Sequence, residues 1–248
     1  MTTTAGRVLV AGLNARAGSA VASRFLRAGW SVVGTVRRPE IIESTIDAVV
    51  TAAGGGRDRL EVRLLDLADP ASVDACGSSL DGDVLDALVV AAAPFDERPL
   101  SAVGYDQFVE QSAVQAAGPA ALAIRLRSSL ASSVRDGGGA VVFFGDIHAR
   151  LRPRPGAMPY LAGKAMLESL VPLLGIELAP TRVFGVAPGV IAWADEFDDA
   201  RREAYLARVP LGRPGTVEEA AALVESMVVA MTYTTGVVIP IDGGRSLR

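Results

Sequence analysis

Short apolar runs alternate with longer stretches of helical spacing along the chain. The short runs are apolar at consecutive positions, as expected of strands in a parallel sheet that helices cover on both faces. We interpret seven of them as strands: Arg7–Ala11, Ser31–Val36, Leu60–Leu65, Leu85–Ala91, Ala140–Gly145, Arg182–Ala187 and Val237–Ile241. Between them, three stretches read as crossover helices: Ser19–Ala28, Pro70–Leu80 and Thr216–Met231.

This alternation predicts an α/β fold, built on a single Rossmann-type doubly wound parallel sheet of seven strands flanked by helices. A chain of 248 residues can bury the core of one such domain, so we expect residues 1–248 to form a single domain. Glycine-rich breaks at Gly54–Gly56 and Gly137–Gly139 lie between predicted elements and indicate turns rather than linkers.

Composition mainly excludes classes of function. Half of the residues are hydrophobic, but Gly, Pro or charge interrupts each apolar run well before the length of a membrane span. The formal net charge of -4 disfavours nucleic acid and membrane surfaces as partners. Cys76 is the one cysteine and His148 the one histidine, so we expect no intramolecular disulfide and no metal site. The polar start Met1–Thr4 does not resemble a signal peptide, and we expect a cytoplasmic protein.

A glycine-rich turn follows the first predicted strand. Gly12 allows a tight turn, and Gly18 allows close packing of helix on strand, which leaves the helix N-terminus facing a pyrophosphate. An ordinary strand-to-helix turn is the alternative. The residues of this turn that we assign to cofactor binding are Gly12, Asn14, Arg16, Ala17 and Gly18.

The second strand ends in Arg37 and Arg38, where an NAD-preferring protein usually has an acidic residue for the ribose 2′-hydroxyl. Both guanidinium groups, together with Arg16, can pair with a 2′-phosphate, which favours NADP(H) as the cofactor. Two solvated arginines opening a helix are the alternative. After the third strand, Asp66 is placed to meet the adenine edge, and we add Leu67 and Ala92 to the cofactor site.

Tyr160 and Lys164 lie four residues apart on a predicted helix, and therefore on one helical face. There an ammonium group can lower the pKa of the phenol, so that tyrosine donates or accepts a proton near neutrality. Because this spacing also arises by chance, a surface pair is the alternative.

Further motifs follow along the chain. Together with the glycine turn, Asp66 and the Tyr160–Lys164 pair, they make the sequence resemble the short-chain dehydrogenase/reductase family along nearly its whole length. The motifs are Leu88–Ala93, Val186–Ile191, Pro210–Pro214 and Thr235–Gly244.

The resemblance implies specific roles. It implies that Tyr160 is the general acid/base, that Lys164 lowers the pKa of Tyr160 and holds the nicotinamide ribose, and that Pro188, Gly189 and Ile191 support the nicotinamide. It also implies a homotetramer, or a homodimer, that associates through helices at Asp106–Leu130 and Ala157–Leu178.

Four positions depart from the usual family pattern. Arg16 replaces the middle glycine of the turn, and Val90–Ala93 replaces an Asn-Asn-Ala-Gly loop. Gln115 replaces the asparagine that completes a proton relay, and Asp146 replaces the substrate-binding serine. Asp146 precedes Tyr160 by fourteen residues, one more than usual. Ile147 therefore takes the serine position unless the loop 152–156 contains an insertion, which we favour because loops absorb length changes easily.

An arginine in the glycine turn and an aspartate in the serine position together resemble pteridine reductases and dihydromonapterin reductases. A carboxyl group can pair with the N–H and amino groups of a pterin and relay a proton to a ring nitrogen. We therefore expect Asp146 and Gln115 to join Tyr160 and Lys164 as catalytic residues in NADPH-dependent reduction of a C=N or C=O bond. The substrate is a small molecule, with pterin-like rings first and imines or ketones next. A simple loop cap is the alternative role for Asp146.

Residues 192–210 fall where the family carries a mobile substrate lid. Within it, Trp193 or Phe197 can cover or stack on the substrate. After Asp146, His148, Arg150, Arg152 and Arg154 can meet an anionic substrate tail, although a solvated loop is the preferred interpretation.

Two other functions remain open. The missing serine and asparagine suit a cofactor-bound sensor or scaffold that has lost catalysis. The same tyrosine also suits redox-neutral chemistry, such as cyclisation or dehydration.

Overall fold

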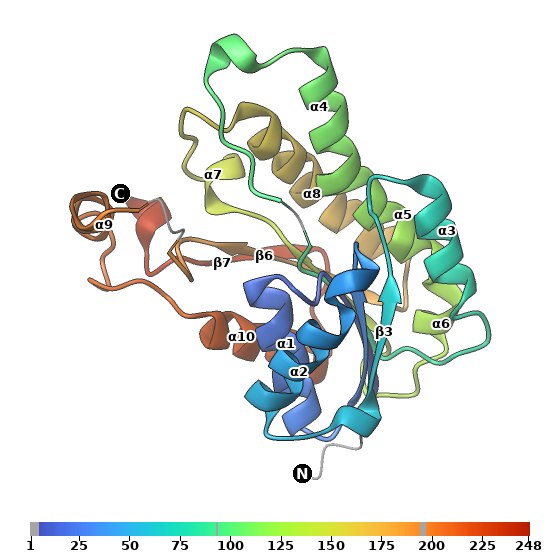
Figure 1. Cartoon of the computed structure of the whole chain (residues 1–248). Coiled ribbons are helices and arrows are strands. Elements are labelled where there is room, and N and C mark those ends of the chain that lie inside the picture. The colour runs from blue at the N-terminus through green and yellow to red at the C-terminus, as the bar shows by residue number, and fades with distance from the viewer. Residues whose placement is uncertain (1–4, 93, 194–196) are drawn as a thin grey trace.

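One parallel sheet of seven strands organises the computed structural model, which describes residues 5–92, 94–193 and 197–248 (Figure 1). The strand order is β3-β2-β1-β4-β5-β6-β7, and each neighbouring pair is parallel. The strands are β1 Arg7–Ala11, β2 Ser31–Val36, β3 Leu60–Leu64, β4 Ala87–Val90, β5 Ala140–Phe144, β6 Arg182–Pro188 and β7 Val237–Ile241. The predicted fold class is confirmed. Each predicted run contains its strand, except that β6 extends one residue further.

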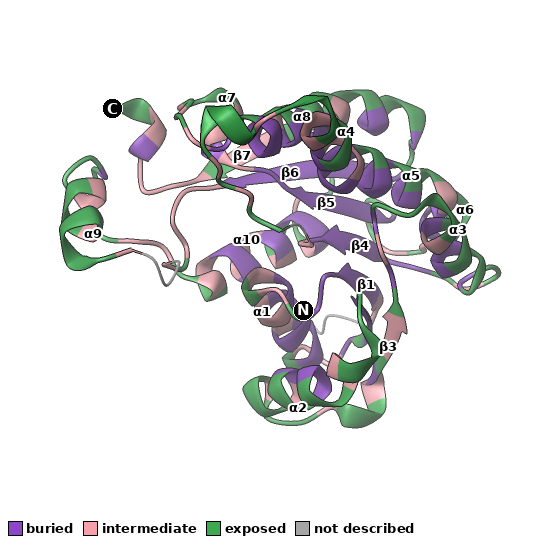
Figure 2. Cartoon of the chain, turned by 45° about the horizontal axis from the view of Figure 1, so that its top comes forward, coloured by how far each residue is buried: buried purple, intermediate pink, exposed green. Residues whose placement is uncertain are grey.

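Helices cover both faces of the sheet, with α1, α2 and α10 on one face and α3, α5 and α8 on the other (Figures 1 and 2). The helices are α1 Arg16–Arg27, α2 Ile42–Ala53, α3 Pro70–Ser78, α4 Tyr105–Ser112, α5 Gly118–Arg125, α6 Arg127–Ala131, α7 Ile147–Arg150, α8 Met158–Glu177, α9 Asp199–Leu206 and α10 Val217–Val229.

The two-residue period of the strands explains this layering. In β1, Val8 and Val10 pack into the core under α1 and α10, whereas Leu9 and Ala11 pack into the core under α3 and α8. All four side chains are fully buried. Because successive strand residues point to opposite faces, an all-apolar strand requires cover on both sides.

The chain changes direction across the sheet between β1 and β4. The chain moves outward from β1 to β2 and β3 on one side, and from β4 to β7 on the other. In doubly wound sheets, ligands bind outside the carboxyl ends of the strands at such a switch point. The glycine turn after β1, the loop after β4 and the residues after β5 and β6 therefore meet at one crevice.

Two helices differ from expectation. Helix α1 begins at Arg16 instead of Ser19, so Arg16, Ala17 and Gly18 form its first turn rather than part of the preceding loop. The helix expected over Asp106–Leu130 is interrupted. A π-helical turn at Ala113–Ala117 separates α4 from α5, and a break at Leu126 separates α5 from α6.

The π-helical turn is visible in one backbone hydrogen bond, in which the N–H of Gly118 donates to the carbonyl oxygen of Ala113, five residues back. The next residue, Pro119, has no backbone N–H and cannot donate to the carbonyl group four residues before it. Such turns are frequent at functional sites, and this one contains Gln115.

Candidate active site

Tyr160 and Lys164 lie one turn apart in α8, and both are buried, at 8% and 5% exposure. Lys164 Nζ donates to the carbonyl oxygen of Phe144 at 2.6 Å and lies 5.9 Å from the centre of the Tyr160 ring. The two side chains therefore form one buried site at the end of β5, and the alternative of a solvated surface pair is wrong.

Asp146 has two contacts, one for each carboxylate oxygen. Oδ1 accepts the backbone N–H of His148 at 2.7 Å, which caps α7. Oδ2 accepts the hydroxyl of Tyr160 at 3.3 Å. Ile147, the competing residue, is fully buried in the interior. Asp146 therefore faces Tyr160, and it also has the capping role that the sequence left as the alternative.

The expected lowering of the Tyr160 pKa is not found. Burial raises the pKa of this phenol well above its ordinary value, and the negative charge and hydrogen bond of Asp146 raise it further. The ammonium of Lys164 instead donates to Phe144. Tertiary packing has placed a carboxylate against the phenol, so the site holds tyrosine in its protonated form.

Glu168 is a buried acid that the sequence reading missed. It is 3% exposed, and its Oε1 accepts the backbone N–H of Asp146 at 3.1 Å. Burial lowers the pKa of Lys164 to about 8, while the negative charges of Asp146 and Glu168 act in the opposite direction. The spacing of four residues after Lys164, which places both on one helical face, was the available signal.

Gln115 lies in the π-helical turn and is fully buried. Its Nε2 donates to the carbonyl oxygen of Pro94 and to Oε1 of Gln111, both at 3.0 Å. Its own Oε1 is buried without a hydrogen-bond partner among the described residues. A buried acceptor of this kind is costly unless a water or ligand satisfies it.

Phe95 is a second residue that the sequence reading missed. Its ring meets the Tyr160 ring edge-on, with centroids 5.2 Å apart, and the side chain is half exposed. The guanidinium of Arg154 lies 5.3 Å from the same ring and pairs with Glu97 at 3.3 Å. The loop after β4 thus places one aromatic side chain beside Tyr160. The only signal for Phe95 in the sequence was an apolar ring within a polar loop.

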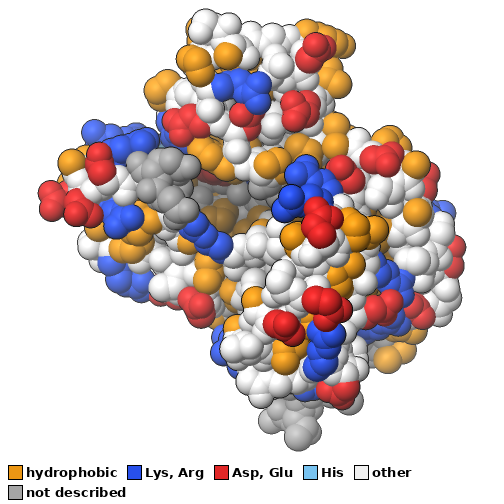
Figure 3. Space-filling model, viewed as in Figure 1, with side chains coloured by type: hydrophobic (Ala, Val, Ile, Leu, Met, Phe, Trp, Pro, Cys, Tyr) orange, Lys and Arg blue, Asp and Glu red, His pale blue; other side chains and the backbone are white. Residues whose placement is uncertain are grey.

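A cavity of about 240 Å³ lies outside the carboxyl ends of β1, β2 and β4. Figure 3 shows this face hollowed between the lobe of α4 and α7 and the part formed by α1 and α2. Gly12 has φ +90°, and a Cβ atom there would lie 2.5 Å from that of Ala92. The glycine therefore allows two loops to approach closely, and the cavity beside them fits a nucleotide.

The predicted cofactor residues divide into three groups. Six of them line the 240 Å³ cavity, which we call the nucleotide cavity: Gly12, Asn14, Arg37, Asp66, Leu67 and Ala92. Arg16 and Ile191 line a second cavity, of about 490 Å³, between α1 and the start of α10. The remaining residues line neither cavity, namely Ala17, Gly18, Arg38, Lys164, Pro188 and Gly189.

Gly18 has a packing role. A Cβ atom at this position would lie 2.1 Å from the carbonyl oxygen of Gly12, which is too close for any side chain. Ala17 packs against the core beneath α1. These two residues hold the first turn of α1 against the glycine turn, where backbone N–H groups of a helix start are available to a ligand.

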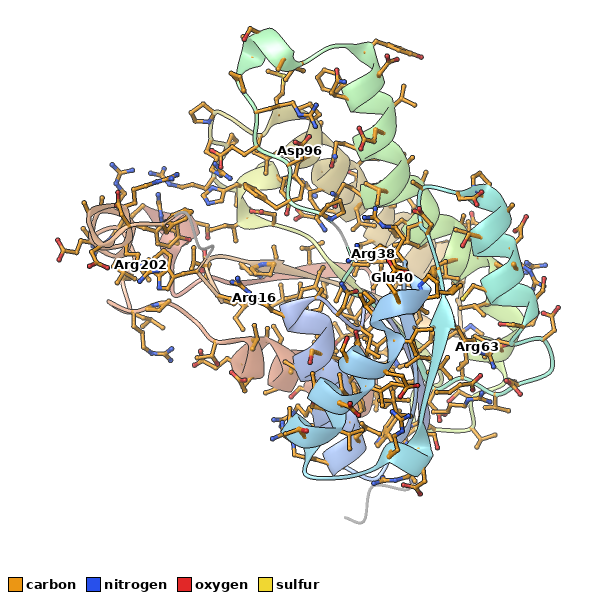
Figure 4. The ribbon with its side chains drawn as sticks, viewed as in Figure 1. Arg16, Arg38, Glu40, Arg63, Asp96 and Arg202 are labelled. Carbon is orange, nitrogen blue, oxygen red and sulfur yellow. The ribbon has the colours of Figure 1, made fainter. Side chains whose placement is uncertain are left out.

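Arg37 and Arg38 are both exposed at the end of β2. Arg38 lies beside Glu40, with Nε 3.6 Å from Oε1 (Figure 4). Asp66 caps its own loop, because Oδ1 accepts the N–H of Ala68 at 2.9 Å. Among the described residues that line the nucleotide cavity, Asp66 is the one acid and Arg37 the one base.

Arg16 reaches from the start of α1 toward the predicted lid. Its guanidinium donates to the backbone carbonyl of Trp193 (Figure 4). Trp193 also packs near Phe197 and Tyr205, with ring centroids 5.5 Å and 5.6 Å away. The predicted substrate residues Trp193 and Phe197 thus belong to one aromatic cluster, while residues 194–196 lie outside the described part of the chain.

Tyr205 in α9 connects this cluster to the Pro-Gly turn after β6. Its hydroxyl accepts the backbone N–H of Val190 at 3.2 Å. Gly189 is anchored on β7 through its N–H, which donates to Ile241 at 3.0 Å. Burial raises the pKa of Tyr205, and the carboxylate of Asp146 contributes in the same direction. The sequence reading missed this tyrosine, which lies inside the predicted lid segment.

None of the helices among the described residues is both long and apolar enough to cross a membrane. The described residues also contain no cluster of three or more His, Cys, Asp or Glu side chains arranged to hold a metal ion.

A parallel sheet with a cavity at its switch point, and a buried tyrosine and lysine near the carboxyl end of β5, is typical of a nucleotide-dependent oxidoreductase of the doubly wound class. A family model described as enoyl-(acyl carrier protein) reductase matches residues 15–246. The chain belongs to the short-chain dehydrogenase/reductase family, whose members use NAD(H) or NADP(H).

Individual relatives agree with this assignment. Protein FixR of Bradyrhizobium diazoefficiens is 29% identical over 97% of this chain and 86% of that protein. The 3-oxoacyl-[acyl-carrier-protein] reductase FabG of Pseudomonas aeruginosa is 37% identical, over 36% of this chain and 38% of that protein. Acetoin dehydrogenase from Enterobacter cloacae shares the fold with a TM-score of 0.81 and 26% identity, over 99% of this chain and 97% of that one.

Proposed function

We propose that this protein is an NADPH-dependent reductase of a C=N or C=O bond in a small planar molecule. Pterin-like heterocycles are the leading substrate candidates, followed by imines and ketones. The observation that carries the proposal is the 3.3 Å contact between Asp146 Oδ2 and the Tyr160 hydroxyl. A carboxylate at this place can accept hydrogen bonds from ring N–H and amino groups, whereas the hydroxyl of a serine mainly binds a carbonyl oxygen.

In this proposal Tyr160 supplies the proton. Because burial and Asp146 raise its pKa, the phenol stays protonated at neutral pH and can donate to a substrate nitrogen or oxygen that gains negative charge. The cofactor, when bound, supplies the hydride. Lys164 holds a positive charge beside the phenol below pH of about 8, and Gln115 offers its buried Oε1 to a proton relay.

Two arginines support NADPH over NADH. Arg37 lines the nucleotide cavity, and Arg38 adjoins it at the end of β2. A guanidinium group pairs well with the 2′-phosphate of NADP(H), and a carboxylate in the same place would repel it. Gly12, Asn14, Asp66 and Leu67 would hold the adenosine half, with the helix start at Ala17 and Gly18 facing the pyrophosphate.

Aromatic side chains support a planar substrate. Phe95 stands edge-on to Tyr160 with half of its surface exposed, so a flat ring can stack against it beside the acid. Residues 192–210 would act as the lid, with Trp193 and Phe197 closing over the substrate. The whole chain then acts as one NADP(H)-binding unit.

A homotetramer, or homodimer, would use the outer faces of α4 and α8. These helices pack on each other and expose Tyr105, Val109, Met166, Leu173 and Ile176 to solvent. Exposed apolar side chains that gather on neighbouring helices suit self-association. Light scattering of the purified protein measures the assembly directly.

The decisive experiment mixes the protein with NADPH and a panel of dihydropterins, quinones, imines and ketones, and follows NADPH absorbance. We expect turnover with at least one planar C=N or C=O substrate, and less with NADH. Tyr160→Phe should remove turnover and keep NADPH binding, because it deletes the proton donor alone.

Other outcomes separate the remaining functions. Tight NADPH binding without oxidation of any panel member would overturn the reductase and favour a sensor. Product formation without NADPH consumption would favour cyclisation or dehydration. Full activity of Tyr160→Phe would contradict the role of the tyrosine.

A further inference from the structure

We propose that Gln111 is a positioning residue, which holds the side-chain amide of Gln115 so that this amide fixes the loop after β4 in the wall of the nucleotide cavity. The inference rests on the proposed function, because it assigns a further residue to the site of the reductase. The sequence reading did not single out this glutamine.

Gln111 is the one buried residue of α4, and it is polar. It is 2% exposed, whereas the other residues of this helix are exposed or partly exposed. The helix packs against α8 (Figures 1 and 2). A buried carboxamide is costly unless its polar groups form hydrogen bonds, so this position requires a partner.

The partner is Gln115, one helical turn further along the chain. Its Nε2 donates to Oε1 of Gln111 and to the carbonyl oxygen of Pro94, both at 3.0 Å. A backbone carbonyl can only accept, so the Gln115 atom that faces Pro94 is the amide nitrogen. The Gln111 atom that meets this nitrogen is then an oxygen. The chemistry of the three groups therefore fixes the direction of both amides.

The same arrangement leaves one acceptor unused. Gln115 Oε1 is buried without a hydrogen-bond partner among the described residues. A flipped amide would place this oxygen against the Pro94 carbonyl, where two acceptors repel each other. The hydrogen bond to Gln111 restrains the amide at a second point. Gln115 thus keeps an acceptor for a donor, such as a water molecule, that enters the site.

Gly163 allows both glutamines to pack against the helix of the catalytic pair. A Cβ atom at this glycine would lie 2.8 Å from the carbonyl oxygen of Gln111 and 2.8 Å from Cβ of Gln115. In the sequence of α8, Gly163 lies between Tyr160 and Lys164. The glutamines therefore contact α8 within the turn that carries the catalytic pair.

Pro94 connects the two glutamines to the nucleotide cavity. Pro94 and Val114 both line this cavity. Gln115 donates to the first of them and directly follows the second in the chain. The residue after Pro94 is Phe95, whose ring meets that of the tyrosine. A restraint on the Gln115 amide therefore acts on the cavity wall and on the aromatic side chain beside the proton donor.

The loop after β4 lacks polar side chains of its own where it begins. Val90–Ala93 are all apolar, so they offer no side-chain hydrogen bonds to the loop. The bond from Gln115 to Pro94 supplies a restraint from the helix side instead. We therefore expect the geometry of this loop to depend on the two glutamines.

The test measures dinucleotide binding in variants of the full chain. Gln111→Met keeps a side chain of similar length and high helix propensity, but it removes the acceptor oxygen. We expect the dissociation constants of NADPH and NADH to rise about 3- to 10-fold, as the loss of one hydrogen bond permits. Fluorescence titration with both dinucleotides gives a result that depends neither on turnover nor on the preferred cofactor.

Gln111→Glu should restore binding. It keeps an oxygen for Gln115 Nε2, and the amide nitrogen that it replaces donates to no described residue. Gln107→Met is the matched control, because Gln107 lies in the same helix and accepts the N–H of Gly104 at 2.7 Å, outside the cavity lining. The control should lower stability in denaturant unfolding and leave dinucleotide binding unchanged.

A double variant tests whether Gln111 acts through Gln115. In Gln115→Met the group that Gln111 holds is gone, so the addition of Gln111→Met should weaken binding no further. Independent structural roles would instead give additive losses. Gln111→Asn, whose shorter side chain withdraws the oxygen, takes the place of Gln111→Met if the methionine variant does not fold.

Four results would overturn the positioning role: unchanged binding in Gln111→Met, equal weakening in Gln111→Glu, equal weakening in Gln107→Met, or an additional loss in the double variant. Failure of the reductase proposal looks different. In that case dinucleotide binding changes as expected, and no panel compound oxidises NADPH.

Discussion

The two ends of the crevice hold their charged groups in opposite ways. At the nucleotide end, Arg37 and Arg38 are exposed to solvent, and the loops after β1 and β4 approach each other closely at Gly12 and Ala92. At the chemical end, Tyr160, Lys164 and Glu168 are nearly inaccessible to water, and the negative charge of Glu168 acts to raise the pKa of both Tyr160 and Lys164. Exposed charges act weakly and independently, whereas buried charges are strongly coupled.

This contrast teaches where specificity resides. We expect that substitution of single surface side chains at the nucleotide end can change the preference between NADPH and NADH without disturbing the sheet. A substitution at the chemical end would disturb its surroundings. Asp146 caps α7, accepts a hydrogen bond from the Tyr160 hydroxyl, and donates its backbone N–H to Glu168. A change at any of these positions alters several contacts at once.

The largest effect is expected from Asp146→Asn. Asparagine keeps an oxygen for the α7 cap but loses the carboxylate that faces Tyr160, so kcat should fall by about 10²-fold or more, while NADPH affinity stays the same. Steady-state kinetics and fluorescence titration measure the two quantities. Asp69→Asn is the matched control, because Asp69 caps α3 in the same manner away from the site. Equal activity of the two variants would contradict the role of Asp146.

The next largest effect is expected from Gly18→Ala, which adds a side chain where α1 packs against the glycine turn at the nucleotide end. The new methyl group would meet the Gly12 carbonyl, so we expect a loss of about 1–3 kcal/mol in unfolding free energy together with weaker NADPH binding. Gly104→Ala is the control, since the nearest atom to its Cβ is the flexible end of Gln107 at 3.2 Å. Denaturant unfolding compares them, and matching curves would refute the tight packing.

A smaller effect separates the two exposed arginines. Arg37→Ala should weaken NADPH binding about 10-fold, as the loss of one charge-assisted pair does, and leave NADH binding nearly unchanged. Arg38→Ala should have less effect, because Arg38 lies outside the cavity lining and close to Glu40. Titration with both cofactors tests this order. Equal losses for NADPH and NADH would argue against recognition of the 2′-phosphate.

The smallest effect concerns pH. Lys164 has a pKa of about 8, so it loses its proton as pH rises through that value, and kcat/KM for reduction should decline above it. Glu168→Gln keeps an oxygen for the Asp146 N–H but removes a charge that favours the ammonium, so the decline should begin at lower pH. A pH profile of both proteins gives the comparison. An unshifted profile would mean that Glu168 acts through structure alone.

Much of the fold was predictable because it depends on spacing along the chain. Runs that are apolar at consecutive positions specify strands that need cover on both faces, and the right-handed connections between parallel strands follow from chain geometry. The Tyr160–Lys164 pair was predictable for the same reason, since residues four apart share a helical face. The glycine turn was predictable as well, because glycines directly after a strand indicate a turn that side chains would block.

Tertiary structure alone decided the electrostatics of the site. Whether Asp146 or Ile147 faces Tyr160 depends on how the loop between α7 and α8 closes, which no local period specifies. The direction of the Tyr160 pKa shift likewise depends on burial and on a neighbour from another element. The sequence by itself determined the sheet, the glycine turn and the helical face that Tyr160 and Lys164 share, whereas packing determined the electrostatics of these two side chains, because desolvation exists only once distant segments have come together.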